Sequence, residues 1–143
     1  MTTIKDKLEK FYGNLKEVEA LRHQIEDLYK ISAYDFQQKI STNEVSNPTE
    51  RNAMKIVELR GKLERRIASL ISNFDEVEDF VESIDDGELR AILRFHYLTG
   101  LSWTETNRKV FGYNSSSTAY MRADRYFDKI EKNSSVDNVN EQE

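Results

Sequence analysis

The feature that most constrains the fold is the spacing of apolar residues in the first 84 positions. From Ile4 to Tyr29 they recur in steps of four and three, with Arg22 filling one position, and a second series runs from Ile56 to Ile84 with a break at Arg60. This spacing places apolar side chains on one stripe of an α-helix. It predicts two long helices, with stripes of Leu8, Phe11, Leu15, Val18 and Ile25 in the first and Leu63, Ile67, Leu70, Phe74, Val77 and Val81 in the second.

A polar segment between the two series marks the end of one helix and the start of another. Residues 41–48 have the sequence STNEVSNP, in which Asn47 is suited to cap a helix and Pro48 to occupy its first position, with Glu50 at the capping-box position. Because two long helices joined by a short loop fold back on each other, residues 1–84 are expected to form an antiparallel coiled-coil hairpin.

The width of the first stripe leaves two forms of packing open. Leu21 and Leu28 widen this stripe, and Phe36 and Ile40 extend it. A single hairpin buries its own apolar residues, whereas a homodimer of two hairpins also covers the flank. We favour the homodimer, because two helices alone leave part of a wide stripe exposed. Gly61 costs about 1 kcal/mol inside a helix and indicates either a close approach or simple tolerance.

Composition supports an all-α protein and excludes several kinds of site. The chain has 143 residues with five glycines, one proline, 33% charged and 38% hydrophobic residues, which is typical of a helix-rich protein. It has no cysteine, so disulfides, thiolate zinc sites and cysteine nucleophiles are excluded. No apolar run long enough for a membrane span and no apolar signal segment occur, so we expect a location in the bacterial cytoplasm.

Helix signals are closely spaced from residue 85 onward. A helix is expected over residues 86–98 and ends at Gly100, and Ser102 caps a short helix that Gly112 ends. A last helix follows Ser115–Ser117, and residues 133–143 are expected to form a disordered tail. The predicted buried face of the last helix consists of Ala119, Ala123, Tyr126, Phe127 and Ile130.

The stretch LRFHYLTGLSWTETNRKVFGYNSSS, within residues 85–132, resembles the region 4 helix-turn-helix of bacterial sigma factors. The resemblance is closest to phage-encoded late-transcription activators of the ArpU and RinA type. It implies a trihelical DNA-binding domain carried on paired N-terminal helices. Two features depart from that family: Asn107 stands where a small residue is usual, and the start of the last helix is rich in serine.

The resemblance implies that the last helix is a recognition helix, which contacts base edges in the major groove with its N-terminal turns. Rotation by 100° per residue away from the buried face points Ser117, Thr118, Met121 and Arg125 outward as candidate base contacts. Arg125 is the candidate suited to a bidentate contact with guanine. The candidate phosphate contacts are Arg108, Lys109 and Arg122 at the flanks and Ser115 and Ser116 near the helix start.

The charge of the chain limits how tightly such a domain binds DNA. The formal net charge is −5, with seven basic and seven acidic residues in positions 85–131. Because affinity for DNA comes largely from phosphate neutralisation, a neutral module is expected to bind weakly by itself. Dimerisation, or contact with host RNA polymerase at the promoter, is therefore expected to supply further binding energy.

Other classes of function were weighed against transcription regulation. His23 and His96 lack further ligands at metal spacing, and the acidic run at residues 75–86 lacks the order of a calcium loop. We expect no metal, no cofactor and no enzymatic activity, and we expect the aromatic residues Phe95, Tyr97, Trp103, Phe111 and Tyr113 to belong to the core. Two alternatives stay open: a DNA-packaging protein like a small terminase subunit, and a protein-interaction module without DNA contact.

Overall fold

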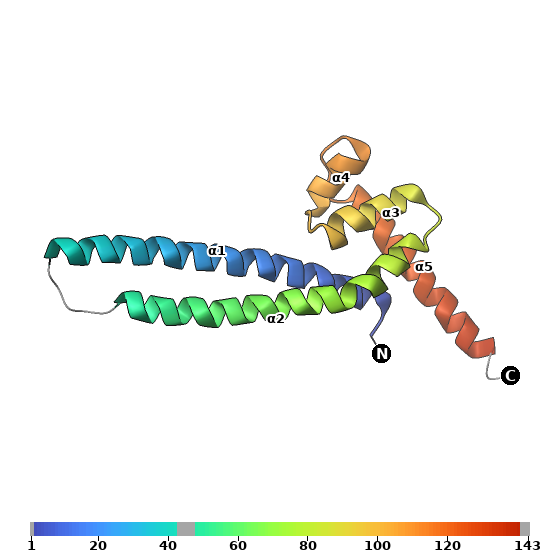
Figure 1. Ribbon diagram of the computed structural model, residues 1–143. Coiled ribbons are helices and arrows are strands. Elements are labelled where there is room, and N and C mark those ends of the chain that lie inside the picture. Colours follow the sequence, from blue (N-terminus) through green and yellow to red (C-terminus); the bar gives the residue numbers. More distant parts are fainter. Residues whose placement is uncertain (1, 43–47, 141–143) are drawn as a thin grey trace. The chain divides into compact units, whose positions relative to one another are not determined.

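The computed structural model describes residues 2–42 and 48–140, with side chains in residues 2–34 and 50–134. All regular structure in this part of the chain is helical, which confirms the all-α prediction. The helices are α1 (Ile4–Thr42), α2 (Pro48–Glu82), α3 (Gly87–Leu93), the π-helix η1 (Arg94–Leu98), α4 (Trp103–Phe111) and α5 (Thr118–Asn140) (Figure 1). None of the helices in the described ranges is both long and apolar enough to cross a membrane.

The chain divides into two compact units, and each long helix contributes to both. Residues 1–12 and 74–143 form the C-terminal unit, and residues 13–73 form the arm unit. The boundary expected after residue 84 differs from this division. The reason is that Val77 and Val81 of α2, like Leu8 and Phe11 of α1, belong to the buried core of the C-terminal unit.

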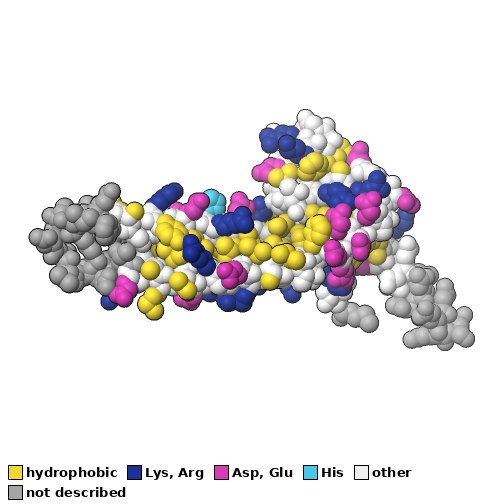
Figure 2. All heavy atoms as spheres, in the orientation of Figure 1, with side chains coloured by type: hydrophobic (Ala, Val, Ile, Leu, Met, Phe, Trp, Pro, Cys, Tyr) yellow, Lys and Arg dark blue, Asp and Glu magenta, His cyan; other side chains and the backbone are white. Residues whose placement is uncertain are grey.

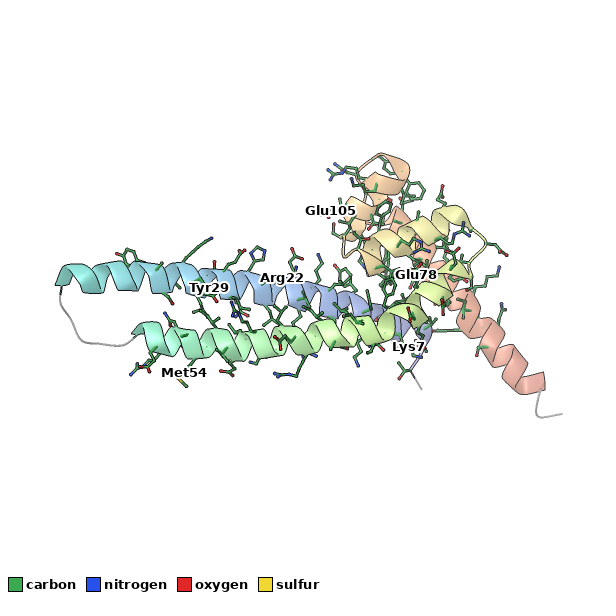
Figure 3. The ribbon with its side chains drawn as sticks, viewed as in Figure 1. Lys7, Arg22, Tyr29, Met54, Glu78 and Glu105 are labelled. Atoms are coloured by element: carbon green, nitrogen blue, oxygen red, sulfur yellow. The ribbon has the colours of Figure 1, made fainter. Side chains whose placement is uncertain are left out.

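In the arm unit, α1 and α2 run side by side in opposite directions (Figure 1). Glu17 and Arg66 form an ion pair at 2.9 Å, and the amide of Asn14 donates to the hydroxyl of Ser69 at 3.4 Å. Nearer the C-terminal end of α1, Arg60 of α2 donates a hydrogen bond to the hydroxyl of Tyr29. Figure 3 shows Tyr29 on α1. These contacts join the facing sides of the two helices.

The buried stripe of α1 in the arm unit differs in part from the predicted one. Val18 and Ile25 are buried as expected, but Leu21 is buried next to the exposed Arg22, and Asn14 is more buried than Leu15. An α-helix has 3.6 residues per turn, so an apolar stripe drifts away from a strict heptad position. The side chains of Phe36 and Ile40 and the predicted Asn47 cap lie outside the described residues, and α2 begins at Pro48 as predicted.

The C-terminal unit has a closed apolar core built from α3, η1, α4, α5 and the adjoining ends of α1 and α2. The helix ends are set locally as predicted: Ser102 Oγ accepts from the N–H of Glu105 at 3.1 Å, and Gly100 and Gly112 adopt φ of 85° and 84°. The buried apolar side chains of this unit are Leu8, Phe11, Val77, Val81, Ile84, Leu89, Ile92, Leu93, Tyr97, Ala119, Ala123 and Phe127.

Two predictions about helix continuity differ from the structure. The helix expected over residues 86–98 changes from α to π geometry at Arg94, and this wider turn buries the consecutive rings of His96 and Tyr97. Residues 133–140, predicted as a disordered tail, continue α5 to Asn140. Extending an existing helix avoids the cost of nucleation, so a polar segment can continue it without burying side chains, and residues 131–134 are exposed.

Candidate nucleic-acid interface

Asn107 fixes the connection between α4 and α5. Its side chain is completely buried, its amide donates to the carbonyl of Tyr113 at 2.9 Å, and its Oδ1 accepts from the N–H of Ala119 at 3.1 Å. The Asn107 side chain therefore holds both the connection after α4, at Tyr113, and the start of α5, at Ala119. The departure of this residue from the sigma-like pattern is explained by these hydrogen bonds across the helix pair.

The serine-rich start of α5 is partly used to cap the helix. The hydroxyl of Ser115 accepts from the N–H groups of Ser117 and Thr118 at 3.3 and 3.4 Å. Ser115 is therefore turned toward the chain, whereas Ser116, Ser117 and Thr118 are exposed. Because Ser115 and Asn107 together accept from three N–H groups at this helix start, fewer of these groups remain for an external phosphate.

The predicted rotation of α5 agrees with the structure. Ala119, Ala123 and Phe127 are buried, while Tyr126 and Ile130 are half-buried at the edge of the same face. The opposite face exposes the four side chains that the sequence put forward as base contacts, namely Ser117, Thr118, Met121 and Arg125. A polar and apolar mixture of this kind suits contact with base edges and thymine methyl groups.

The basic residues of the C-terminal unit fall into two groups. Arg94 donates to both oxygens of Glu78 at 2.8 Å and to Glu82 at 2.7 Å, and Arg90 donates to the carbonyl of Ile84 at 2.6 Å. By contrast, the exposed side chains of Arg108, Lys109, Arg125 and Lys129 make no hydrogen bond or ion pair with any described residue. The net charge of residues 85–131 does not distinguish the paired arginines from the exposed cations, because each cation adds one positive charge whether or not it has a partner.

Arg122 belongs to the first group, although the sequence proposed it as a phosphate contact. It forms ion pairs with Asp86 and Glu88 at the start of α3. The carboxylate of Asp86 also accepts from the N–H of Leu89 at 3.2 Å. The pKa of Asp86 is lowered, mainly by this backbone hydrogen bond and to a smaller extent by the hydrogen bond from Arg122. Arg122 therefore joins α5 to α3 in the structure, and its guanidinium is engaged within the protein.

The aromatic residues form a cluster whose membership was only partly predicted. Tyr97 is buried and Phe95, Trp103 and Phe111 are half-buried, but Tyr113 is exposed. The ring of His96 stacks on Trp103 and Tyr12, with centroid distances of 3.7 and 4.4 Å, and its Nδ1 donates to the carbonyl of Leu101 at 2.7 Å. His96 is thus a buried core residue whose ring is hydrogen-bonded and stacked within the unit.

Within residues 2–42 and 48–140, no group of His, Cys, Asp and Glu side chains is arranged to hold a metal ion. Figure 2 shows that dark blue basic side chains and yellow apolar side chains both reach the surface where α4 and α5 lie. No family model, curated protein or solved structure matches the chain. The geometry of α4 and α5 and the resemblance in residues 93–117 are therefore the grounds for a functional proposal.

Proposed function

We propose that the protein regulates transcription of a phage or mobile element by binding promoter DNA through α4 and α5, used as a sigma region 4-like helix-turn-helix. The observation that carries the proposal is a set of exposed cations: the side chains of Arg108 and Lys109 on α4 and Arg125 on α5 have no hydrogen-bond or ion-pair partner among the described residues. They accompany the exposed Ser117, just before α5, and the exposed Thr118 and Met121 on its first turn. Arg108 and Lys109 contact phosphates, and Arg125 contacts a guanine edge.

The same charges make the domain a weak DNA binder by itself. Arg90, Arg94 and Arg122 are neutralised or held within the unit, so few cations remain to release counterions from DNA. We propose that host RNA polymerase at the promoter supplies further binding energy and that the protein acts as an activator. A regulator of this kind needs no nanomolar affinity for its site.

A homodimer formed through the arm unit supplies avidity. We propose that the antiparallel pair of α1 and α2 is a coiled-coil hairpin whose outer flank packs on a second copy. Met54, Val57 and Ile71 expose 70%, 70% and 71% of their surface, and Figure 3 shows Met54 pointing away from α1. Figure 2 shows a yellow apolar band along the arm unit. A second hairpin removes such apolar surface from water.

Gly61 fits this dimer. On a helical projection it lies on the same flank of α2 as Met54, Val57 and Ala68. A Cβ at this position would meet only the guanidinium of Arg65, at 3.4 Å, on its own helix, so packing within the chain does not require a glycine. A small residue on an apolar flank permits close approach of a neighbouring helix, which offsets its cost of about 1 kcal/mol.

The test compares two unpaired cations on the same helix. Sites selected from random duplexes by the wild-type protein are used to measure binding of Arg125→Ala and of the matched variant Lys129→Ala. We expect Arg125→Ala to lose sequence preference and Lys129→Ala to keep it, because residue 125 lies near the recognition turns and residue 129 a further helical turn away. Thermal unfolding should be nearly unchanged in both variants, since both side chains are exposed.

Footprinting with and without host RNA polymerase holoenzyme then separates the partners. We expect the isolated protein to bind its best site no tighter than about micromolar at physiological salt, and polymerase to tighten or reposition the footprint. Nanomolar binding without polymerase would contradict the activator mechanism while leaving DNA binding intact. Absence of binding under both conditions would favour the interaction-module alternative.

A further inference from the structure

The C-terminal unit contains a cavity that DNA binding does not use. It has a volume of about 340 Å³, within the range of small-ligand sites. Residues from α1, η1, α4 and α5 form its walls, which consist of six ring side chains, three charged side chains and one alanine. The rings that line it are Tyr12, His96, Tyr97, Trp103, Tyr120 and Phe127.

Among the lining rings, Tyr12, His96 and Trp103 form a stack with His96 in the middle, and Tyr97 and Tyr120 meet this stack at steep angles. Tyr120 meets Trp103 edge to face at 5.4 Å between centroids, and Tyr97 meets Trp103 in the same way at 5.8 Å. Tyr120 remains 45% exposed, so its ring borders both the cavity and solvent. Ring faces carry partial negative charge, and several rings at different angles attract a cation placed between them.

The charged lining of the cavity is acidic overall. Lys5 pairs with Asp124 at 3.4 Å and thereby neutralises that carboxylate. Glu9 also lines the cavity and has no hydrogen bond or ion pair to any residue that the structure describes. Glu9 interacts electrostatically with the same Lys5, so one ammonium faces two carboxylates and the lining keeps a net negative charge beside the rings. Burial raises the pKa of the Tyr97 hydroxyl, and nearby Glu9, Tyr120 and Asp124 raise it further.

We propose that this cavity binds an organic cation with an alkylated ammonium head group, such as a quaternary amine. The aromatic walls contribute cation–π attraction and the Glu9 carboxylate contributes charge attraction. A simple primary ammonium ion is less suited, because it is strongly hydrated. The ammonium group of Lys5 also lines the cavity already and would repel it at short range. The site is separate from the proposed DNA contacts on α4 and α5, and the proposal does not rest on DNA binding.

Trp103, the only tryptophan of the chain, gives a direct readout because it lines the cavity. Its fluorescence is followed while the full chain is titrated with choline, with a capped trimethyllysine and with 3,3-dimethylbutan-1-ol, at constant ionic strength. The alcohol is the neutral isostere of choline. We expect a saturable change with choline or trimethyllysine at a dissociation constant of about 1 mM or below, and binding of the alcohol at least about tenfold weaker.

Choline and trimethyllysine distinguish a free small molecule from a modified side chain as the source of the head group, and the tighter of the two identifies it. The matched variants are Glu9→Gln, in the cavity, and Glu105→Gln, on the exposed first turn of α4. Glu9→Gln should weaken cation binding about threefold to tenfold, and Glu105→Gln should leave it unchanged. Equal binding of the alcohol, unchanged affinity in Glu9→Gln, or no saturable signal at about ten times the expected dissociation constant would overturn the proposal.

Discussion

In the C-terminal unit, Val81, Ile92 and Leu93 are completely inaccessible to solvent, whereas Leu63, Ile67 and Leu70 of the arm unit are only half-buried. All six are branched apolar residues in helices, so the difference is one of surroundings. Among the described residues, α3, η1, α4, α5 and the adjoining ends of α1 and α2 enclose the core of the C-terminal unit, while two helices face each other in the arm unit. A helix pair covers one side of each helix, and a wide apolar stripe therefore needs a further partner.

The largest difference should be seen when the same side chain is truncated in each unit. Ile92→Ala removes atoms from a site with no solvent access and is expected to lower the free energy of unfolding by about 2–5 kcal/mol. Ile67→Ala, at a half-buried site, should cost clearly less, at about 1–2 kcal/mol. Denaturant unfolding of the full chain at low protein concentration measures both. Equal costs would show that Ile67 is as tightly enclosed as Ile92.

Local signals explain why much of the C-terminal unit was predictable. Ser102, Gly100 and Gly112 act through hydrogen bonds or backbone conformation within a few residues, and they end or start helices as expected. The buried face of α5 follows directly from helical periodicity, since Ala119, Ala123 and Phe127 repeat at steps of four. These features need no knowledge of distant parts of the chain.

The features that were missed depend on distant partners. Arg122 is paired with acids about 35 positions earlier in the chain, and Asp86 also caps α3. Tyr12 stacks on His96 from the far end of the sequence, and this cluster accompanies the change to π geometry at Arg94. Spacing along one helix carries no information about such pairs. The cavity beside Glu9 was missed for the same reason.

A slightly smaller effect is expected at the polar connection that holds α4 and α5. Asn107→Ala removes both the donor to Tyr113 and the acceptor for Ala119, and leaves their backbone groups without these partners. We expect a loss of about 2–3 kcal/mol, because buried unsatisfied groups retain their desolvation cost. Asn114→Ala, at an exposed position of the same connection, is the control and should change stability by less than about 0.5 kcal/mol. Similar losses in both variants would contradict the role of Asn107.

Stability of the arm unit should depend on protein concentration if a second copy covers its outer flank. For a dimer that dissociates on unfolding, each tenfold increase in concentration adds about 1.4 kcal/mol to apparent stability. Ile71→Glu places a charge on the exposed flank and should remove this dependence, and Ser72→Glu, one position away on an exposed site, should keep it. Light scattering at about micromolar protein gives the assembly state independently.

That measurement also separates the alternatives that the sequence left open. A dimer in the wild type and a monomer in Ile71→Glu support the hairpin dimer. A monomer in both shows that the flank is not an interface between copies and removes the avidity that the DNA proposal uses. A larger ring would favour the DNA-packaging alternative.

The smallest expected change in stability concerns two buried hydroxyl groups, one in each unit. The hydroxyls of Thr106 in the C-terminal unit and Ser32 in the arm unit are buried without a hydrogen-bond partner in the described part of the chain. Because a buried unpaired hydroxyl carries a desolvation cost, Thr106→Val and Ser32→Ala should each increase stability, by up to about 1 kcal/mol. Thr118→Val, at an exposed site on α5, serves as the control and should change little.

The two gains are expected to be unequal, and the difference tests how each unit is packed. Thr106 is completely buried, so removal of its hydroxyl should give the full benefit without opening a path for water. The residue Ser32 is only half-buried, and small shifts of the helix pair can bring water to its hydroxyl. Ser32→Ala should therefore increase stability less than Thr106→Val in matched denaturant titrations. The reverse order would mean that the arm unit excludes water at Ser32 as completely as the C-terminal unit does at Thr106, which requires a partner covering the helix pair.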